Sequence, residues 1–266
     1  MTLDLSTRRA LLFLPASNPR AIARARASDA DLVILDLEDA VKPADKASAR
    51  AAAVAVVAER WSMLVAIRIN ASASDHYAAD LAAVAGSRAD LIVVPRVSSA
   101  SEIEAVAAAV ACPVAAMIET AAGVLAAPAV ARVAAALIAG TNDLSADLRL
   151  PARAGRAPLQ MALQSILVAA RAAGAAAFDG VFNRLDDPAG LAAECAESRM
   201  LGFDGKSLIH PDQIAPCHAA FAPSPDEVAR AERLVAAATG GAERFEGAMI
   251  EAMHVEAARR LLGRAR

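Results

Sequence analysis

Residues 114–124 read VAAMIETAAGV, and residues 137–143 read LIAGTND. In both stretches a short apolar run of strand-forming length ends at polar residues that include a carboxylate, Glu119 in the first and Asp143 in the second. A carboxylate directly after a strand is commonly the N-cap of the next helix. If the two strands are parallel neighbours, however, both side chains project from one edge of a sheet, where a divalent cation or a substrate can be held.

The rest of the chain repeats this pattern. Short apolar runs rich in Val, Ile and Leu alternate with longer alanine-rich segments of helical period, as in successive βα units. Each run is apolar throughout, as expected for parallel strands covered on both faces. Eight such units in 266 residues favour a closed (β/α)8 TIM barrel over a doubly wound open sheet. The predicted strands are Leu11–Leu14, Leu32–Leu37, Leu64–Ile69, Leu91–Val94, Val114–Ile118, Ala136–Ala139, Ala176–Phe178 and Gly202–Ile209.

The pattern changes after Phe221. Pro223-Ser224-Pro225 is typical of a linker or a helix start, and Asp226–Ala237 and Ala248–Leu262 both have helical period. We therefore expect two domains, a barrel over residues 1–222 that carries the chemistry and a C-terminal helical extension over residues 223–266.

Composition excludes several classes of protein. The 27 Lys and Arg against 30 Asp and Glu leave no basic surplus for a phosphate backbone, and 3% aromatic residues provide no platform for stacking bases, so no nucleic-acid partner is expected. No stretch is long enough for a membrane span. The three cysteines have no metal-ligand spacing, which is typical of unreactive thiols in a reducing compartment and predicts a cytoplasmic protein.

Familiar catalytic motifs are missing from the sequence. It contains no G-x-G-x-x-G, no H-E-x-x-H and no G-x-S-x-G, and Gly205-Lys206-Ser207 resembles only the end of a phosphate loop because Met200 occupies the position of the leading glycine. These absences argue against dinucleotide-binding, P-loop, zincin and serine hydrolase assignments.

Polar residues gather where the predicted strands end. In a barrel these ends form one rim, on which the active site is built. Arg68 is unusual among them because it lies within the apolar run VAIRI, where a charge is costly unless it is paired. Structural ion pairing and binding of an anion are both open for it. The residues at the predicted rim are Asn18, Asp36, Glu38, Asp39, Arg68, Asn70, Arg96, Glu119, Thr120, Asn142, Asp143, Asp179, Asn183, Lys206 and His210.

Seven blocks of the sequence resemble the HpcH/HpaI aldolase and citrate lyase beta-subunit (CitE-like) family, which includes malyl-CoA lyases. They cover nearly the whole chain in the family's order. The blocks are Arg9–Leu14 with Pro15, DLVILDLEDAV (31–41) with Lys46 and Arg50, VAIRIN (65–70), VVPRV (93–97), MIETAAGV (117–124), GTNDLSADL (140–148) and LGFDGKSLIHPDQI (201–214).

The resemblance assigns roles to the residues at the rim. Glu119 and Asp143 are expected to hold Mg²⁺, with Mn²⁺ as a substitute, and Arg68 to bind the carboxylate of a keto-acid substrate. Few carboxylates and free positions for water and substrate suit Mg²⁺, and the planar guanidinium fork matches a carboxylate. The expected catalytic residues are Arg68, Asp36, Glu38 and Glu251, and those expected to contact substrate are Arg68, Asp39 and Arg96, with Asp36, Glu38 and Asp39 around the metal's outer shell.

The resemblance implies a lyase that cleaves or forms the carbon–carbon bond of a 3-hydroxyacyl-CoA such as citryl-CoA or malyl-CoA. The products are acetyl-CoA and a 2-keto acid such as oxaloacetate, formed through a metal-stabilised enolate, and the CoA thioester is the substrate and not a resident cofactor. Two alternatives remain: a class II aldolase that acts on 2-keto acids through a pyruvate enolate, and a non-catalytic ligand-binding barrel. The HpcH-like aldolases carry histidine where this chain has Asp39. Partners are small molecules and other copies of the chain, in a homotrimer or hexamer.

The C-terminal extension implies a contribution from a second subunit. In CitE-like enzymes an aspartate of a G-x-M-I-D sequence serves near the proton-transfer step, in the site of a neighbouring subunit. This chain reads GAMIE at 247–251, so Glu251 keeps the charge and moves it by one methylene. A solvent-facing helix residue is the alternative for Glu251. Further departures from the family pattern, at Ala16, Arg96 and Arg149, lie in loops expected to meet the substrate.

Overall fold

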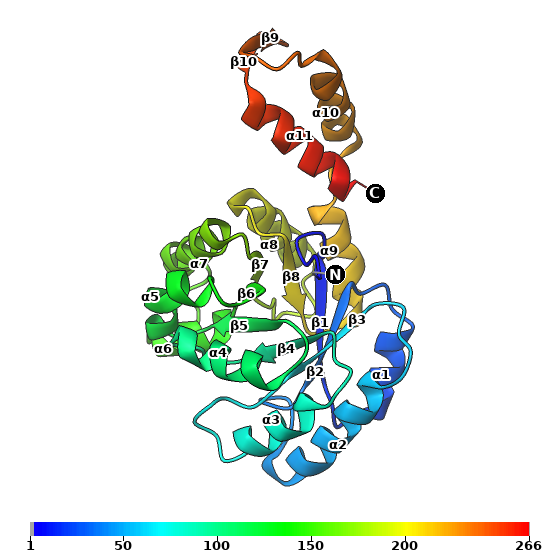
Figure 1. Ribbon diagram of the computed structural model, residues 1–266, viewed down its shortest axis with the longest axis vertical. Helices are drawn as coiled ribbons and strands as arrows, with labels where there is room; N and C mark the ends of the chain where they lie inside the picture. Colours follow the sequence, from blue (N-terminus) through cyan, green and yellow to red (C-terminus); the bar gives the residue numbers. More distant parts are fainter. Residues whose placement is uncertain (1–2, 266) are drawn as a thin grey trace. The chain divides into compact units, whose positions relative to one another are not determined.

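The structure is a computed structural model that describes residues 3–265. Eight parallel strands close into a barrel in chain order, and β1 pairs with β8 to complete the ring, as Figure 1 shows. The predicted (β/α)8 barrel is therefore confirmed. The strands are β1 (Ala10–Pro15), β2 (Leu32–Asp36), β3 (Leu64–Arg68), β4 (Leu91–Val94), β5 (Val114–Ile118), β6 (Ala136–Ala139), β7 (Ala176–Asp179) and β8 (Gly205–Leu208).

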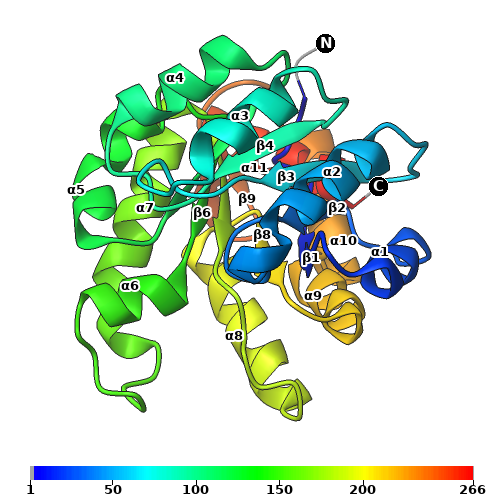
Figure 2. The same cartoon turned by 90° about the horizontal axis from the view of Figure 1, so that it is seen from below.

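Helices follow every strand and cover the outside of the barrel, as the view in Figure 2 shows. Short 3-10 helices at Pro43–Asp45, Ala157–Leu159 and Pro211–Gln213 precede α2, α7 and α9. The helices of the barrel are α1 (Pro19–Arg26), α2 (Lys46–Val57), α3 (Tyr77–Ala85), α4 (Ala100–Ala109), α5 (Ala121–Val130), α6 (Thr141–Asp147), α7 (Gln160–Ala173), α8 (Pro188–Leu201) and α9 (Ile214–Phe221).

The strands are buried on both faces, which explains their apolar sequences. Alternate residues point into the barrel and form one interior cluster, which includes Leu11, Ile34, Val93, Met117 and Phe178. The register between neighbouring strands then decides which polar residues meet at the carboxyl ends. Asp36 at the end of β2 lies opposite Arg68 at the end of β3, and Ile118 of β5 lies opposite Ala139 of β6.

The largest difference from the predicted strands is at the start of the eighth, and the other bounds differ by at most one residue. The predicted eighth strand began at Gly202, but Gly202 has φ +108° and ends α8 in the left-handed conformation, so β8 begins only at Gly205. The N–H groups of Gly202 and Phe203 both donate to the carbonyl oxygen of Ser198, which is the usual way a glycine closes a helix.

The structure divides the chain into two compact units, Met1–Ala220 and Phe221–Arg266. Residues 1, 2 and 266, which the domain prediction includes, lie outside the described residues. The second unit contains α10 (Pro225–Ala237), β9 (Glu243–Phe245), β10 (Ala248–Ile250) and α11 (Ala252–Arg264), around the buried residues Ala231, Leu234, Ile250 and Ala258.

The helix predicted over Ala248–Leu262 is wrong in its first turn. Ala248–Ile250 pairs antiparallel with Glu243–Phe245, and the turn between them places Glu246 and Gly247 at positive φ. The helix starts at Ala252, directly after Glu251. Within residues 3–265, no helix combines the length and the apolar character needed to cross a membrane.

Candidate functional site

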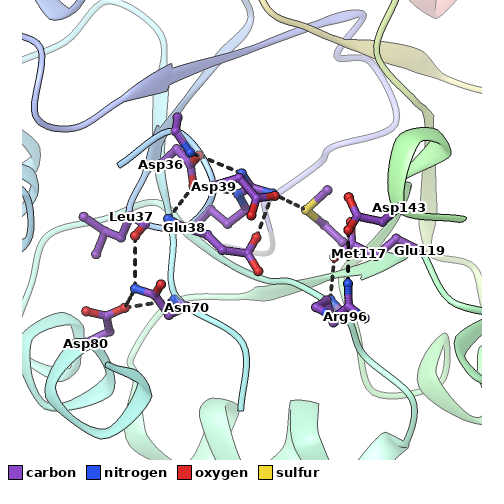
Figure 3. A network of polar contacts seen from close by, with 12 residues as sticks. Asp36, Leu37, Glu38, Asp39, Asn70, Asp80, Arg96, Met117, Glu119 and Asp143 are labelled. Carbon is purple, nitrogen blue, oxygen red and sulfur yellow. Dashed lines mark hydrogen bonds and ion pairs between the residues drawn. The ribbon is translucent and has the colours of Figure 1, made fainter. Parts of the chain in front are cut away.

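A cavity of about 360 Å³ opens at the carboxyl ends of the barrel strands. Its polar lining includes five residues expected at the site, Asp36, Asp39, Arg68, Glu119 and Asp143, while Phe13, Met117, Val181 and Ile209 give it an apolar side. Figure 3 shows Arg96 and Glu38 in contact with these residues. The structure thus brings seven of the eight expected site residues together around one cavity.

Arg68 is the centre of an ion-pair network on one side of the cavity. Its Nε and Nη2 donate to the two carboxylate oxygens of Asp36 at 2.7 and 2.6 Å. Its Nη1 lies 2.9 Å from an oxygen of Glu38 and 3.8 Å from one of Asp39, and the guanidinium lies 5.1 Å from the centre of the Phe13 ring. Of the two roles open for Arg68, these contacts favour structural ion pairing over anion binding, because most of its N–H donors are used within the protein.

Asp36 holds the loop after β2 as well as Arg68. Its carboxylate accepts hydrogen bonds from the backbone N–H groups of Glu38 and Ala40 at 2.8 and 2.9 Å. From beneath, the buried Lys46 ammonium donates to the carbonyl oxygens of Leu37 and Glu38, each at 2.7 Å. The loop that carries Glu38 and Asp39 is therefore fixed by charged side chains on both sides.

Lys46 belongs to a second buried network that sequence reasoning did not connect with the site. It also donates to Asn70 Oδ1 at 2.7 Å, and Asp80 of α3 accepts from the backbone N–H of Asn70 at 2.9 Å and from Arg50 at 2.6 Å. Lys46 and Arg50 were noted in the sequence only as parts of a family block. Their apolar neighbours in α2 give no sign that both side chains would be drawn to the end of β3.

Arg96 joins the two expected metal ligands on the other side of the cavity. Its backbone N–H donates to Glu119 Oε1 at 2.6 Å, and its guanidinium Nη1 donates to Asp143 Oδ1 at 3.0 Å (Figure 3). Arg96 has φ +52°, a left-handed conformation that is uncommon for a residue with a side chain. Such backbone strain is concentrated at functional sites, where the surrounding structure enforces it.

The carboxyl groups of the cavity are crowded, and two of them have raised pKa values. Burial raises the pKa of Glu38 to about 8, against the lowering effect of Arg68 and with a further rise from three neighbouring carboxylates. Burial also raises the pKa of Glu119 to about 7, although Arg68 and the N–H of Arg96 lower it, and the charge of Asp143 adds to the rise. In both groups the desolvation caused by burial outweighs the effect of the neighbouring guanidinium groups and favours the neutral carboxyl group.

The donor chemistry of the cavity fits Mg²⁺. Glu119, directly after β5, and Asp143, in the first turn of α6, supply hard oxygen donors. The surplus of carboxylates over guanidinium groups in the cavity lining favours an added cation. Within residues 3–265 no three His, Cys, Asp or Glu side chains are grouped as a complete metal site. Mg²⁺ is commonly held by only one or two carboxylates, with water and substrate oxygens at its remaining positions.

Two residues expected at the rim lie elsewhere. Asp179 and Lys206 are fully buried and form an ion pair of 2.7 Å, to which Glu194 of α8 adds a second contact with Lys206 at 2.6 Å. Arg156, from the loop before α7, lies 3.0 Å from Asp179. Their side chains meet residues of the helical layer and do not line the cavity, because neighbouring residues of a strand point to opposite faces.

Glu251 lies in the second unit, at the residue before α11. Its side chain is exposed, and its backbone N–H donates to Nδ1 of His254 at 2.9 Å. This contact fixes the start of the helix and leaves the carboxylate accessible. The catalytic role expected for Glu251 remains a prediction.

The closed barrel and the acidic cavity at the carboxyl ends of its strands place the protein in the class of (β/α)8 barrels. In this class the active site is built from the loops that follow the strands. The sequence pattern of the HpcH/HpaI aldolase/citrate lyase family matches residues 9–211. The chain belongs to this family, and the resemblance noted in the sequence is confirmed.

Named relatives cover almost the whole chain. A (3S)-malyl-CoA thioesterase of Cereibacter sphaeroides is 40% identical in an alignment 271 positions long, which covers 97% of this chain and 94% of the relative. Citrate lyase subunit beta of Escherichia coli is 33% identical in an alignment 282 positions long, which covers 97% of this chain and 93% of the relative. The crystal structure of CitE from Mycobacterium tuberculosis in complex with magnesium, acetoacetate and coenzyme A has a TM-score of 0.85 and 34% identity, and the match covers 98% of this chain and 99% of that one.

Proposed function

We propose that this protein is a Mg²⁺-dependent carbon–carbon lyase that cleaves or forms a 3-hydroxyacyl-CoA of the malyl-CoA or citryl-CoA type. The observation that carries the proposal is the convergence of Glu119, directly after β5, and Asp143, in the first turn of α6, on one acidic cavity with guanidinium groups beside it. Family membership supports it, as do the magnesium, acetoacetate and coenzyme A in the CitE complex.

The charged residues of the cavity have distinct parts in the proposed reaction. Mg²⁺ at Glu119 and Asp143 would polarise a substrate oxygen and favour negative charge on it. Asp36 and Arg68 hold each other and fix the loop of Glu38 and Asp39 beside this position. The cavity of about 360 Å³ would take the hydroxyacyl group, with the carbon chain against its apolar side.

With malyl-CoA as substrate, a base takes the proton of the substrate hydroxyl and the carbon–oxygen double bond of glyoxylate forms. The electron pair of the broken carbon–carbon bond passes to the α-carbon of the thioester, which then takes a proton and becomes acetyl-CoA. Glu251 of a neighbouring subunit is the proposed base, in a homotrimer or hexamer. A carboxylate in that position would act by general acid–base catalysis, which typically contributes a factor of about 10² to 10⁴.

The direct test supplies purified protein with (3S)-malyl-CoA, citryl-CoA and β-methylmalyl-CoA, with Mg²⁺ or with EDTA, and follows the 2-keto acid product. Metal-dependent cleavage of one of them is expected. Glu119→Gln removes one metal ligand at nearly constant volume and should abolish both turnover and Mn²⁺ binding. A failure to cleave any of the three thioesters in the presence of Mg²⁺ would overturn the lyase proposal.

Thioester hydrolysis is the second candidate function, favoured by the 40% identity to (3S)-malyl-CoA thioesterase over 97% of the chain. Water would then attack the thioester carbonyl, and malate and free coenzyme A would leave. The two reactions separate by product: free thiol with malate for hydrolysis, glyoxylate with acetyl-CoA for the lyase. A class II aldolase would instead exchange the methyl protons of pyruvate without any thioester.

A further inference from the structure

A second cavity, of about 470 Å³, lies at the amino ends of the barrel strands. Its lining comes from the segment before β1, from the connection between α2 and β3, and from the connection between α3 and β4. We call it the basal cavity, and its charged residues are Arg8, Glu59, Arg60, Arg88 and Asp90. It shares no lining residue with the cavity at the carboxyl ends, where the active site of such barrels is built.

Both acidic residues of the basal cavity have partners of their own. Glu59 Oε2 lies 2.7 Å from the guanidinium of Arg26, and Asp90 Oδ2 accepts a hydrogen bond from the backbone N–H of Val65 at 2.8 Å. The three arginines of the lining and Arg26 together exceed these two carboxylates by two charges, in a chain whose net charge is −3. The basal cavity is therefore a locally basic region of an acidic protein.

The three arginines of the lining have no counter-ion. In the part of the chain that the structure describes, the guanidinium groups of Arg8, Arg60 and Arg88 form neither an ion pair nor a hydrogen bond. The Nε atom of Arg8 is in addition buried without a hydrogen-bond partner. Arg8 thus carries a partly desolvated positive charge, which costs free energy unless an anion neutralises it.

Arg156 shows how the fold treats other buried guanidinium groups. Its Nε and Nη2 also lack hydrogen bonds of good geometry, but they lie 3.1 and 3.0 Å from carboxylate oxygens of Glu197 and Asp179. Their charge is neutralised within the protein. The guanidinium of Arg8 has no such carboxylate beside it, so its counter-ion has to come from outside the chain.

The backbone around the basal cavity is fixed although the arginine side chains are free. The N–H of Arg8 donates to the carbonyl oxygen of Leu5 at 3.1 Å, and the carbonyl oxygen of Arg60 accepts from Nη1 of Arg26 at 2.9 Å. These contacts hold the α-carbons of both arginines in place. An anion would therefore order only side chains, which lowers the entropic cost of binding.

We propose that the basal cavity binds a phosphate group, either as inorganic phosphate or as part of a phosphate monoester, through Arg8, Arg60 and Arg88. A single guanidinium satisfies a planar carboxylate, whereas a tetrahedral phosphate has additional oxygens and nearly two negative charges for guanidinium groups from separate segments. The volume of about 470 Å³ leaves room for the organic part of an ester. The proposal does not depend on the lyase activity proposed for the opposite end of the barrel.

The protein contains its own reporter for this test. Trp61, the single tryptophan of the chain, lines the basal cavity, and its ring lies 4.1 Å from the guanidinium carbon of Arg26. Titration with inorganic phosphate and with glycerol 2-phosphate, at constant ionic strength and with EDTA, is followed by tryptophan fluorescence and by isothermal titration calorimetry. Saturable binding of at least one of them, with one site per chain, is expected. EDTA prevents binding through a divalent cation at the other cavity.

Arg8→Gln and Arg88→Gln should each weaken this binding about tenfold or more, as expected for a lost charge-assisted hydrogen bond. Arg88 is exposed, so its replacement leaves the fold intact, and thermal unfolding without phosphate checks both variants. Arg132→Gln is the matched control and should bind phosphate as wild type does. Arg132 is exposed in the turn between α5 and β6, at the same end of the barrel, and does not line the basal cavity.

The two phosphate compounds distinguish the source of the group. Tighter binding of glycerol 2-phosphate would assign the site to an ester, and tighter binding of inorganic phosphate to the free ion. Calorimetry that detects no binding of either compound would overturn the proposal, as would equal affinity in wild type, Arg8→Gln and Arg88→Gln. An equal loss in Arg132→Gln would reduce the effect to net charge, and malonate bound as tightly as phosphate would overturn the assignment to a phosphate group.

Discussion

The backbone of Gly140, at the end of β6, packs directly against the side chain of Glu119, which follows β5, and a β-carbon at position 140 would overlap the Glu119 carboxylate. The pairing of β5 with β6 brings the two residues together, since the Gly140 N–H donates to Ile118 at 3.1 Å. Gly140 is thus required by the close approach of a proposed metal ligand and not by its own backbone angles, because its φ is −100°.

Gly140→Ala is expected to displace the Glu119 carboxylate and to weaken Mn²⁺ binding by about 10- to 100-fold, the usual range when a group that orients a metal ligand is changed. Mn²⁺ titration followed by electron paramagnetic resonance measures the effect. Gly86→Ala is the control, because a β-carbon there meets nothing within 4 Å. Wild-type affinity in Gly140→Ala would show that Glu119 does not bind the metal in the position described.

Removal of the Arg68 side chain should lower the free energy of unfolding. Arg68→Met leaves Asp36, which is 1% exposed, without its ion-pair partner, and the expected loss is about 3–5 kcal/mol in the free energy of unfolding. Urea denaturation measures it. The double variant Arg68→Met/Asp36→Asn removes the unpaired charge and should recover part of the loss; a double variant no more stable than Arg68→Met would contradict this account.

The buried pair of Lys206 and Asp179 predicts a pH-dependent stability. Burial acts to raise the pKa of Asp179, but Lys206 and Arg156 outweigh it and hold that pKa below its usual value. A carboxyl group with a lowered folded-state pKa stabilises the fold above its ordinary pKa of about 3.9, and this contribution is lost as the pH falls through the folded-state value.

Lys206→Met should therefore be most destabilising near neutral pH, where Asp179 stays charged without its main partner. As the pH is lowered, protonation of Asp179 relieves the variant, and its deficit relative to wild type should shrink. Urea denaturation over a pH series measures the difference, with Lys42→Met as an exposed control that should show no such trend. A deficit that grows toward acid pH would contradict the assignment.

The proposed role of Glu251 across subunits can be tested by complementation. Glu119→Gln and Glu251→Ala should each be inactive alone, the first through loss of the metal and the second through loss of the base. If Glu251 serves a neighbouring barrel, randomly mixed oligomers of the two variants should regain about a quarter of the wild-type activity, because one site in four then combines an intact barrel with an intact extension. Mixed oligomers verified by two affinity tags that stay inactive would exclude this role.

The sequence predicts the barrel well because burial on both faces leaves a clear signal. Every predicted strand exists, and Leu91–Val94, Val114–Ile118 and Ala136–Ala139 have the predicted bounds. The larger errors occur where only the apolar character of a short segment was available to assign it to a strand or a helix. Ala248–Ile250 is too short for periodicity to separate a strand from a helix start, and Gly202 could have been recognised as the end of α8.

The residues around the cavity could be predicted as a set, because strand ends share one rim, but their contacts could not. The sequence does not show that Asp36 accepts two hydrogen bonds from Arg68, because this contact depends on the register of β2 and β3. Arg156 gives no signal at all in the sequence, because it lies in a loop more than twenty residues from Asp179 and reaches it only through the packing of the helical layer.

The excess of carboxylates over guanidinium groups at the mouth of the barrel has a kinetic consequence. A thioester with a negatively charged acyl group that approaches the metal-free protein meets a field of its own sign, which slows encounter, whereas a divalent cation is attracted. We therefore expect an ordered kinetic mechanism in which the divalent cation binds first and the thioester second. Excess thioester would then form no dead-end complex with the metal-free protein, and Mg²⁺ would be an essential activator of thioester binding.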